Sequence, residues 1–243
     1  MELRGRVALV TGGGRRLGRA LAGALADRGM TLAIHHHASA EGATSLRDEI
    51  VGRGGRASCF AADLTDPHAA RDLPCRVVRE FGRLDVLVNS AAIMRKLRFE
   101  ETTPEQFDAI LDLNLRAAFF CTQGAADALR SVRGRVVNVA DLAGLEPWVG
   151  YAAHSISKAG VVMLTKVLAL SLAPEVNVNG IAPGAVLVPD DYDAAERERL
   201  ARATPLRRLG RPDDVVGALL YLLEGGDFVT GQVLVVDGGR VLR

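Results

Sequence analysis

The sequence predicts an α/β fold, a single domain with a doubly wound parallel sheet of seven strands and helices on both faces. Short runs rich in β-branched residues alternate with longer amphipathic segments along all 243 residues, the order that parallel strands with crossover helices require. Several of the short runs are apolar throughout, as expected of strands buried on both faces. No linker-like or repetitive stretch interrupts the alternation, so we expect residues 1–243 to form one domain.

The expected elements follow one another in strand–helix order. Strands are expected at the short apolar runs, residues 7–10, 31–34, 57–61, 84–88, 135–139, 176–181 and 232–236. Helices are expected between them, at residues 17–28, 41–53, 67–81, 151–172 and 212–223, with one long helix beginning at Pro104. The apolar residues of that long helix keep helical spacing as far as Phe119. Ligands bind beyond the carboxyl ends of the strands in such a sheet, so the residues after each strand are the candidates for a site.

The composition excludes several classes of protein. Thirty Lys and Arg against 29 Asp and Glu give a net charge of +1, which offers no electrostatic basis for binding nucleic acid or an anionic membrane. No stretch approaches about eighteen consecutive apolar residues, so no membrane span is expected, and residues 1–6 leave no room for a signal peptide. Cys59, Cys75 and Cys121 form no CxxC pair, which argues against a disulfide framework and a zinc site. We therefore expect a cytoplasmic protein.

A glycine-rich turn follows the first expected strand and opens the first helix. It reads Thr11-Gly12-Gly13-Gly14-Arg15-Arg16-Leu17-Gly18. Glycines let the backbone turn tightly and approach a pyrophosphate, whose charge is favoured by the free N–H groups of the helix start. Ordinary strand–helix turns also contain glycines, so the dinucleotide interpretation depends on further motifs.

This turn resembles the TGxxxGxG turn of the short-chain dehydrogenase/reductase family. Gly12 and Gly18 match it, whereas Arg16 replaces the middle glycine, a variant that resembles the pteridine reductase branch of that family. The resemblance covers nearly the whole chain, because Asn89-Ser90-Ala91-Ala92 is a loose version of the family's NNAG and Thr230-Gly231-Gln232 to Asp237-Gly238-Gly239 matches its ending. It implies a Rossmann-like sheet that binds a nicotinamide dinucleotide.

The resemblance implies a set of cofactor-binding residues at the ends of successive strands. They are Gly12, Arg15, Arg16, Leu17, Gly18, His36, His37, Ser39, Asp63, Leu64, Asn89, Ala91, Lys158, Pro183 and Gly184. By resemblance Asp63 contacts the adenine, and as a local residue it reads equally well as a helix cap or turn residue.

The segment after the second strand favours NADPH over NADH. An NAD enzyme places an acidic residue there, on the adenine ribose, and this chain has His35-His36-His37-Ala38-Ser39 with His36 at the acidic position. A carboxylate would repel a 2′-phosphate, whereas imidazoles, the Ser39 hydroxyl and the two arginines of the first turn suit one. The pteridine reductase branch has an arginine where this chain has Ala38. Successive side chains of a strand point to opposite faces, so the three histidines are not expected to bind a metal.

Four residues reduce carbonyl groups in most members of the family: an Asn, a Ser, and a Tyr and Lys spaced YxxxK on one helix. In this chain Lys158 and Asn114 are present, Asp141 occupies the serine position, and His154 stands where the tyrosine is expected. Residues four apart lie on one helix face, and an imidazole titrates near neutrality, so His154 is the expected proton donor. Its ring is shorter than a phenol, and Tyr151 is the alternative donor.

The substrate is expected beside the ends of the fourth, fifth and sixth strands, where loops carry specificity. The residues expected to contact it are Met94, Asp141, Trp148 and His154, with Leu97, Val149 and residues 186–192 at its border. Arg95, Lys96 and Arg98 attract an anionic group or form a solvated face. Residues 190–193 and 196–199 read as a small lid helix.

Three functions are compatible with these residues. The first is an NADPH-dependent reductase of a small carbonyl or C=N compound, pterin-like in class. The second is a proton-transfer enzyme without redox chemistry, and the third is a catalytically silent member that binds cofactor or a partner. The resemblance also implies a homo-oligomer, a tetramer or dimer, formed through the helices at residues 107–119 and 161–172 and the last strand. Burial of those helices within one chain is equally compatible with their sequence.

Overall fold

The computed structural model describes residues 1–188 and 192–243. Its described residues form a seven-stranded, wholly parallel sheet in the order β3-β2-β1-β4-β5-β6-β7. The strands are β1 (Val7–Val10), β2 (Thr31–His36), β3 (Ala57–Ala61), β4 (Val86–Asn89), β5 (Arg135–Val139), β6 (Asn177–Pro183) and β7 (Val233–Val236). The predicted fold class is therefore confirmed.

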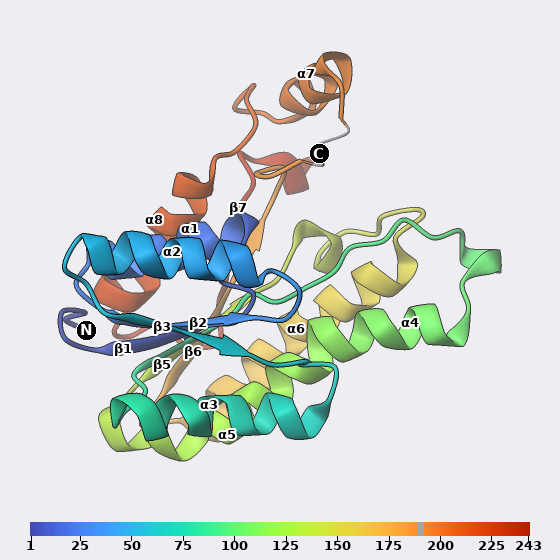
Figure 1. Ribbon diagram of the computed structural model, residues 1–243. Helices are drawn as coiled ribbons and strands as arrows, with labels where there is room; N and C mark the ends of the chain where they lie inside the picture. The colour runs from blue at the N-terminus through green and yellow to red at the C-terminus, as the bar shows by residue number, and fades with distance from the viewer. Residues whose placement is uncertain (189–191) are drawn as a thin grey trace.

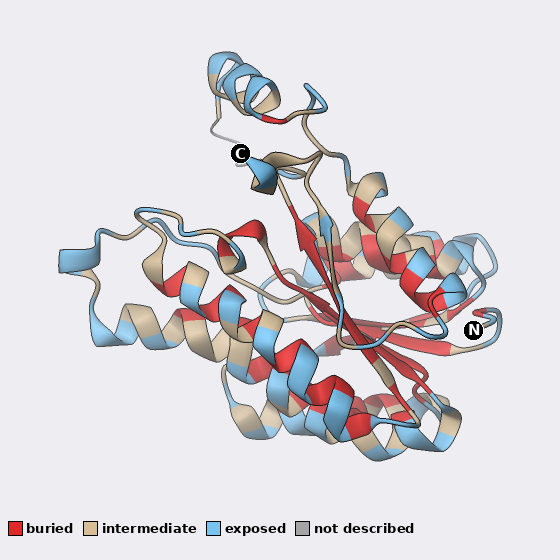
Figure 2. Ribbon diagram, turned by 180° about the vertical axis from the view of Figure 1, so that it is seen from behind, coloured by how far each residue is buried: buried red, intermediate tan, exposed pale blue. Residues whose placement is uncertain are grey.

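Helices cover both faces of the sheet (Figure 1). The α-helices are α1 (Arg16–Asp27), α2 (Ala40–Gly52), α3 (Pro67–Phe81), α4 (Pro104–Leu111), α5 (Ala117–Val132), α6 (Ala152–Leu172), α7 (Ala194–Ala203) and α8 (Pro212–Leu220). Helices α1, α2 and α8 pack on one face and α3, α5 and α6 on the other, each over its own apolar core. Figure 2 shows the buried residues concentrated in the strands and on the inward faces of these helices, whereas α7 buries none.

The long helix expected from Pro104 is a run of three parts. Its start is fixed by a capping box in which Thr103 Oγ1 accepts from Gln106 N and the Gln106 side chain accepts from Thr103 N. A π-helical turn, η2 (Asp112–Arg116), then separates α4 from α5. Such wide turns are frequent at functional sites, and this one contains Asn114. The spacing of apolar residues in the sequence does not reveal the extra residue of this π-helical turn, so the sequence predicted one uninterrupted helix.

Helix α6 is long and apolar enough to cross a membrane by length and composition. It is instead a core helix of the sheet, with ten buried residues that include His154, Ser157 and Lys158. Its apolar character comes from packing against β5, β6 and the segments around Asn114, and such burial makes its hydropathy weak evidence for a membrane span.

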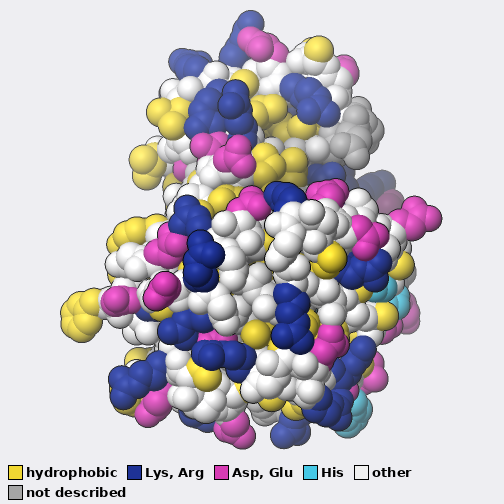
Figure 3. Space-filling model, turned by 60° about the vertical axis from the view of Figure 1, so that its left-hand side comes forward, with side chains coloured by type: hydrophobic (Ala, Val, Ile, Leu, Met, Phe, Trp, Pro, Cys, Tyr) yellow, Lys and Arg dark blue, Asp and Glu magenta, His cyan; other side chains and the backbone are white. Residues whose placement is uncertain are grey.

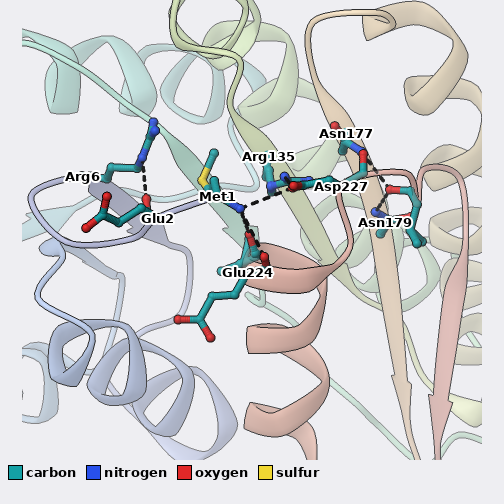
Figure 4. Close-up of polar contacts among 10 residues, drawn as sticks. Met1, Glu2, Arg6, Arg135, Asn177, Asn179, Glu224 and Asp227 are labelled. Carbon is teal, nitrogen blue, oxygen red and sulfur yellow. Dashed lines mark hydrogen bonds and ion pairs between the residues drawn. The ribbon is translucent and has the colours of Figure 1, made fainter.

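The amino-terminal edge of the sheet is closed by polar contacts (Figure 4). Arg135 at the start of β5 pairs with Asp227. Asn177 and Asn179 donate side-chain hydrogen bonds to the carbonyl of Val229 at 3.0 and 2.7 Å. These contacts fix the loop before β7 and stabilise the amino-terminal edge of the sheet. A binding site is expected at the opposite edge, where the strands have their carboxyl ends.

The surface carries charges of both signs. Figure 3 shows Lys and Arg side chains interspersed with Asp and Glu over the visible face, with hydrophobic side chains between them. This mixture agrees with the net charge of +1.

Candidate active site

A cleft of about 760 Å³ runs along the carboxyl ends of β1, β2, β4, β5 and β6, and we call it the strand-end cleft. Most residues predicted for cofactor and catalysis line it. These are Gly12, Arg15, Arg16, Leu17, Gly18, His37, Ser39, Asp63, Leu64, Ala91, Met94, Asp141, His154, Lys158, Pro183 and Gly184. Four predicted residues do not line it: His36, Asn89, Asn114 and Trp148.

The glycine-rich turn requires glycine for steric reasons. Gly12 has φ +67°, and a Cβ there would lie 3.0 Å from Ala91 Cα. A Cβ on Gly18 would lie 2.2 Å from the Gly12 carbonyl oxygen, so the first turn of α1 packs directly on the glycine loop. Thr11 Oγ1 accepts from the backbone N–H groups of Ser90 and Ala91 at 2.9 and 3.1 Å. The ends of β1 and β4 are thereby held together beneath the cleft.

His35 supports the same turn from β2. Its ring is buried, Nδ1 accepts from the Gly12 N–H at 3.0 Å, and Nε2 lies 3.1 Å from the Ala62 carbonyl oxygen. The Gly13 N–H is bound by the His35 backbone carbonyl at 2.9 Å. Burial lowers the pKa of His35 to about 4, although the hydrogen bond to Ala62 opposes the shift. The imidazole is therefore neutral, with its proton on Nε2.

The neighbouring histidines diverge as strand alternation requires. His37 lines the strand-end cleft with Ala38, Ser39 and Arg15. His36 is the last residue of β2 and is not among the residues that line the cleft, and its Nδ1 lies 3.4 Å from the His37 carbonyl oxygen. In residues 1–188 and 192–243 no group of three His, Cys, Asp or Glu is arranged to hold a metal.

Asp63 and Asn89 make local contacts. Asp63 Oδ1 accepts from Thr65 N and Thr65 Oγ1, and these bonds lower the pKa of the Asp63 carboxyl. It is thus a turn residue that also lines the cleft. Asn89 is buried and donates to Thr122 Oγ1 at 3.0 Å and Asn138 Oδ1 at 2.9 Å, which ties β4 to β5 and α5. Its side chain points into the core rather than into the cleft.

Asn114 is buried behind the cleft and organises its wall. Its Oδ1 accepts from Ile93 N at 2.8 Å, and its Nδ2 lies 2.9 Å from the Ile93 carbonyl oxygen and 3.0 Å from Ser157 Oγ. The π-helical turn directs this side chain inward, between the segment after β4 and α6. Asn114 therefore positions other groups and does not itself line the cleft.

His154 lies on α6 with its side chain almost wholly buried. Its Nδ1 is 3.3 Å from the Ile93 carbonyl oxygen and 3.4 Å from Asn114 Nδ2. Its Nε2 lies 3.7 Å from Asp141 Oδ2 and makes no hydrogen bond. His154 is among the residues that line the cleft, and a buried polar atom without a partner in such a residue is a position at which a ligand contact is expected.

Lys158 follows His154 by one helical turn and is also buried. Its ammonium group donates to the Val139 carbonyl oxygen at 2.7 Å. Burial lowers the pKa of Lys158 to about 8, while Asp141 raises it. Asp141 also accepts from the Ala143 N–H at 2.9 Å, so its carboxylate is fixed at the end of β5. One acid, one imidazole and one amine thus converge on the cleft.

The predicted substrate residues are only partly brought together. Met94 lines the cleft, as do Arg95, Val186 and Leu187. Trp148 instead donates from Nε1 to Glu146 and packs edge-on against Tyr151, with ring centroids 6.1 Å apart. Neither Trp148 nor Tyr151 is among the residues that line the cleft.

The expected lid is a helix, α7, capped by Asp193 and Glu196. Residues 190 and 191 of the expected lid lie outside the described residues. Arg16 reaches across the cleft and donates to the Leu187 carbonyl oxygen at 2.6 Å, which joins the glycine-rich turn to the segment before the lid. Arg98 pairs with Glu101 at 2.7 Å and forms part of a solvated face.

Three groups that shape the site were not identified from the sequence: the Ile93 carbonyl group, Ser157 and His35. The Ile93 carbonyl group is invisible to residue patterns, because every residue carries one. Ser157 could have been found from its position next to Lys158. His35 could have been found from strand alternation, which places it on the face opposite to that of His36.

Comparison with known proteins gives a consistent set of relatives. Residues 13–240 match the family model described as Enoyl-(Acyl carrier protein) reductase. The chain is 35% identical over 244 residues to a 3-oxoacyl-[acyl-carrier-protein] reductase of Synechocystis, with 99% of this chain and 98% of that one covered. It is 34% identical to the 3-oxoacyl-[acyl-carrier-protein] reductase FabG of Thermotoga maritima, each chain being covered in full.

A solved structure agrees with the fold. A crystal structure described as that of a short-chain alcohol dehydrogenase from Sinorhizobium meliloti superposes with a TM-score of 0.93 at 31% identity. The alignment covers 99% of this chain and 98% of the other.

Proposed function

The chain belongs to the short-chain dehydrogenase/reductase family and is a nicotinamide-dependent oxidoreductase, and we propose that it is an NADPH-dependent reductase of a small carbonyl or C=N compound. The observation that carries this proposal is the unpartnered Nε2 of His154, buried in the cleft wall 3.7 Å from Asp141. Reduction of a carbonyl or C=N group needs a hydride and a proton, and a proton donor at this nitrogen would supply the proton.

The residues of the strand-end cleft fit a dinucleotide. The cleft volume of about 760 Å³ is ample for a ligand of cofactor size, and it extends from His37 and Ser39 to Asp141 and His154. When bound, the nicotinamide nucleotide supplies the hydride. The glycine-rich turn and the start of α1 would hold the pyrophosphate, and Pro183 and Gly184, which line the same cleft, would border the nicotinamide.

Discrimination in favour of NADPH is assigned to Arg15, His37 and Ser39. All three line the cleft after β1 and β2, and no carboxylate occurs in residues 35–40 to repel a 2′-phosphate. Guanidinium and hydroxyl groups are suited to a phosphate ester. We expect Arg15→Ala to weaken NADPH binding and to leave NADH binding nearly unchanged.

The proton path belongs to His154, Asp141 and Lys158. Protonated His154 donates from Nε2 to the substrate oxygen or nitrogen, and the Asp141 carboxylate stabilises the imidazolium. Lys158, with its pKa lowered to about 8 by burial, supplies a second titrating group on the same helix face.

The class of substrate is a small carbonyl or C=N compound. Arg16 in place of the middle glycine and Asp141 in place of the serine both resemble the pteridine reductase branch, which favours a pterin-like compound. The named relatives act on 3-oxoacyl groups, which favour a carbonyl. The His154–Asp141 pair also suits a proton transfer without redox change, and such an enzyme would form product with no change in nicotinamide absorbance.

The decisive experiment combines a substrate panel with two variants at His154. Wild type is expected to oxidise NADPH with a carbonyl or C=N substrate and His154→Ala to lose about 100-fold or more. His154→Tyr tests whether the remaining site is competent. Binding of NADPH without turnover in wild type, unrestored by His154→Tyr, would instead support a silent member of the family.

The same family membership supports a cytoplasmic homo-oligomer, a tetramer or dimer. Phe119 on α5 and Met163, Val167 and Leu170 on α6 are exposed apolar side chains, and burying such a row between chains is favourable. Sedimentation as a monomer at micromolar concentration would contradict this proposal.

A further inference from the structure

The orientation of the Asn114 amide is fixed by its backbone partner. Ile93 N is a donor, so the atom 2.8 Å from it is the amide oxygen of Asn114. The amide nitrogen consequently faces Ile93 O, Ser157 Oγ and His154 Nδ1, at 2.9, 3.0 and 3.4 Å. This assignment does not depend on the protonation of His154.

Hydrogens can then be counted around His154 Nδ1. The Ser157 hydroxyl donates its one hydrogen to the His154 carbonyl oxygen at 2.7 Å, so its oxygen accepts from Asn114. The two hydrogens of Asn114 Nδ2 are thus used by Ser157 Oγ and Ile93 O, the two nearer acceptors. No hydrogen remains for Nδ1 to accept, and Nδ1 lies 3.3 Å from the Ile93 carbonyl oxygen. An unprotonated Nδ1 would place two lone pairs against each other in a buried site.

We infer that neutral His154 is held as the Nδ1–H tautomer by Ile93 and Asn114, so that its Nε2 faces the cleft as a proton acceptor. In this state the site is set to take a proton from a substrate hydroxyl. The proton of the O–H group would go to Nε2, and an oxidised nicotinamide nucleotide, when bound, would accept the C–H hydride, so that the alcohol becomes a carbonyl compound. Reduction is the reverse and begins from the doubly protonated ring.

Charged groups lie around the ring. Asp141 at the end of β5 has a carboxylate oxygen 3.7 Å from Nε2. Lys158 on α6 itself and Arg95 after β4 line the same cleft. Because Lys158 has a pKa of about 8, it titrates within the same experiments, so a rate profile alone does not identify His154.

The direct test is long-range ¹H–¹⁵N NMR of the uniformly ¹⁵N-labelled protein, without added nucleotide, at alkaline pH. His154 is expected to show a protonated, pyrrole-type Nδ1 and an unprotonated, pyridine-type Nε2. His35 is the internal control, because its contacts with Gly12 and Ala62 demand the opposite tautomer. His154→Gln identifies the His154 signals among the five histidines, with circular dichroism to confirm its fold. A pyrrole-type Nε2 on His154 would overturn the inference.

The consequence for turnover rests on the proposed function and is measured separately. Alcohol oxidation is expected to rise and carbonyl reduction to fall as the ¹⁵N signals show His154 losing its second ring proton. Asp141→Asn removes the carboxylate 3.7 Å from Nε2 and is expected to lower the rate of reduction more than the rate of oxidation, a split that a merely structural role would not produce. Should the tautomer be as inferred while no substrate changes nicotinamide absorbance, the proposed function fails and the tautomer assignment stands. Should turnover occur while His154 has the other tautomer, the tautomer assignment fails and the proposed function stands.

Discussion

Gly12 donates its backbone N–H to Nδ1 of His35 at 3.0 Å, and the same imidazole reaches the Ala62 carbonyl oxygen with Nε2. The glycine-rich turn therefore depends on a side chain of β2, which in turn is tied to the end of β3. Only a neutral imidazole can accept from Gly12 and donate to Ala62 at once. This coupling makes the conformation of the glycine-rich turn depend on a buried histidine.

A pair of substitutions at His35 separates its two hydrogen bonds. The shorter amide introduced by His35→Asn retains an acceptor near the place of Nδ1, whereas the longer amide of His35→Gln retains a donor near the place of Nε2. Losing a hydrogen bond of this kind costs about 0.5–1.5 kcal/mol, so we expect the Gln variant to raise the KM for NADPH by about two- to tenfold. The Asn variant should raise it less, and kcat at saturating NADPH should change little in both. Equal KM values for the two variants would show that the Gly12 contact does not control the turn.

Acid is expected to destabilise the fold through His35. Its pKa is lowered in the folded protein from 6.5 to about 4, so the unfolded chain binds the proton more readily. The stability contributed by the neutral ring is complete above pH 6.5 and is lost as pH falls towards 4, by about 3 kcal/mol in the limit. Urea unfolding at pH 7 and pH 5 should show a larger loss in wild type than in His35→Asn. A matching loss in the two proteins would assign the acid sensitivity to other groups.

Lys158 is expected to be necessary for activity but costly for stability. Burial lowers its pKa to about 8, so its charge opposes folding below that pH and the free energy of unfolding rises between pH 8 and 10.5. Lys158→Met should lower kcat by about 100-fold or more and raise the free energy of unfolding at pH 7 by about 1–3 kcal/mol. Thermal and urea unfolding measure the second effect. A destabilised Met variant would mean that the hydrogen bond to Val139 outweighs the cost of burying the charge.

Gly12 and Gly217 form a matched test of the glycine-rich turn. Gly12 has φ +67° and meets Ala91 at 3.0 Å, whereas a Cβ on Gly217, inside α8, meets nothing within 4 Å. Gly12→Ala should lower the free energy of unfolding by about 1–3 kcal/mol and raise the KM for NADPH. Gly217→Ala should raise stability by about 0.5–1 kcal/mol and leave the KM unchanged. Chemical denaturation and initial rates of both variants provide the comparison, and a fully stable Gly12→Ala would contradict the steric argument.

Sequence patterns were sufficient for those parts of the fold that depend on local periodicity. Residues 7–10 were placed correctly as a strand, because an uninterrupted apolar run between turn residues leaves little choice in a parallel sheet. The short segments 57–61 and 135–139 were also placed correctly. The long helix after Pro104 was predicted without its interruption, since the π-helical turn at Asn114 inserts a residue without changing the apolar character of its neighbours. The family membership implied by the glycine-rich turn and the later motifs is confirmed, whereas the pteridine reductase branch stays a proposal.

The sequence by itself determined which residue types stand after each strand, because that order is covalent. It thereby indicated His154, Asp141 and Lys158 as a group. Only the tertiary structure decided how they face one another: Trp148 turns away to Glu146, Asn114 reaches Ile93, and Nε2 of His154 is left without a partner beside Asp141. The reason is physical, since hydrogen-bond partners and burial arise from segments far apart in the chain, and one backbone carbonyl, that of Ile93, fixes which nitrogen of the imidazole carries the proton.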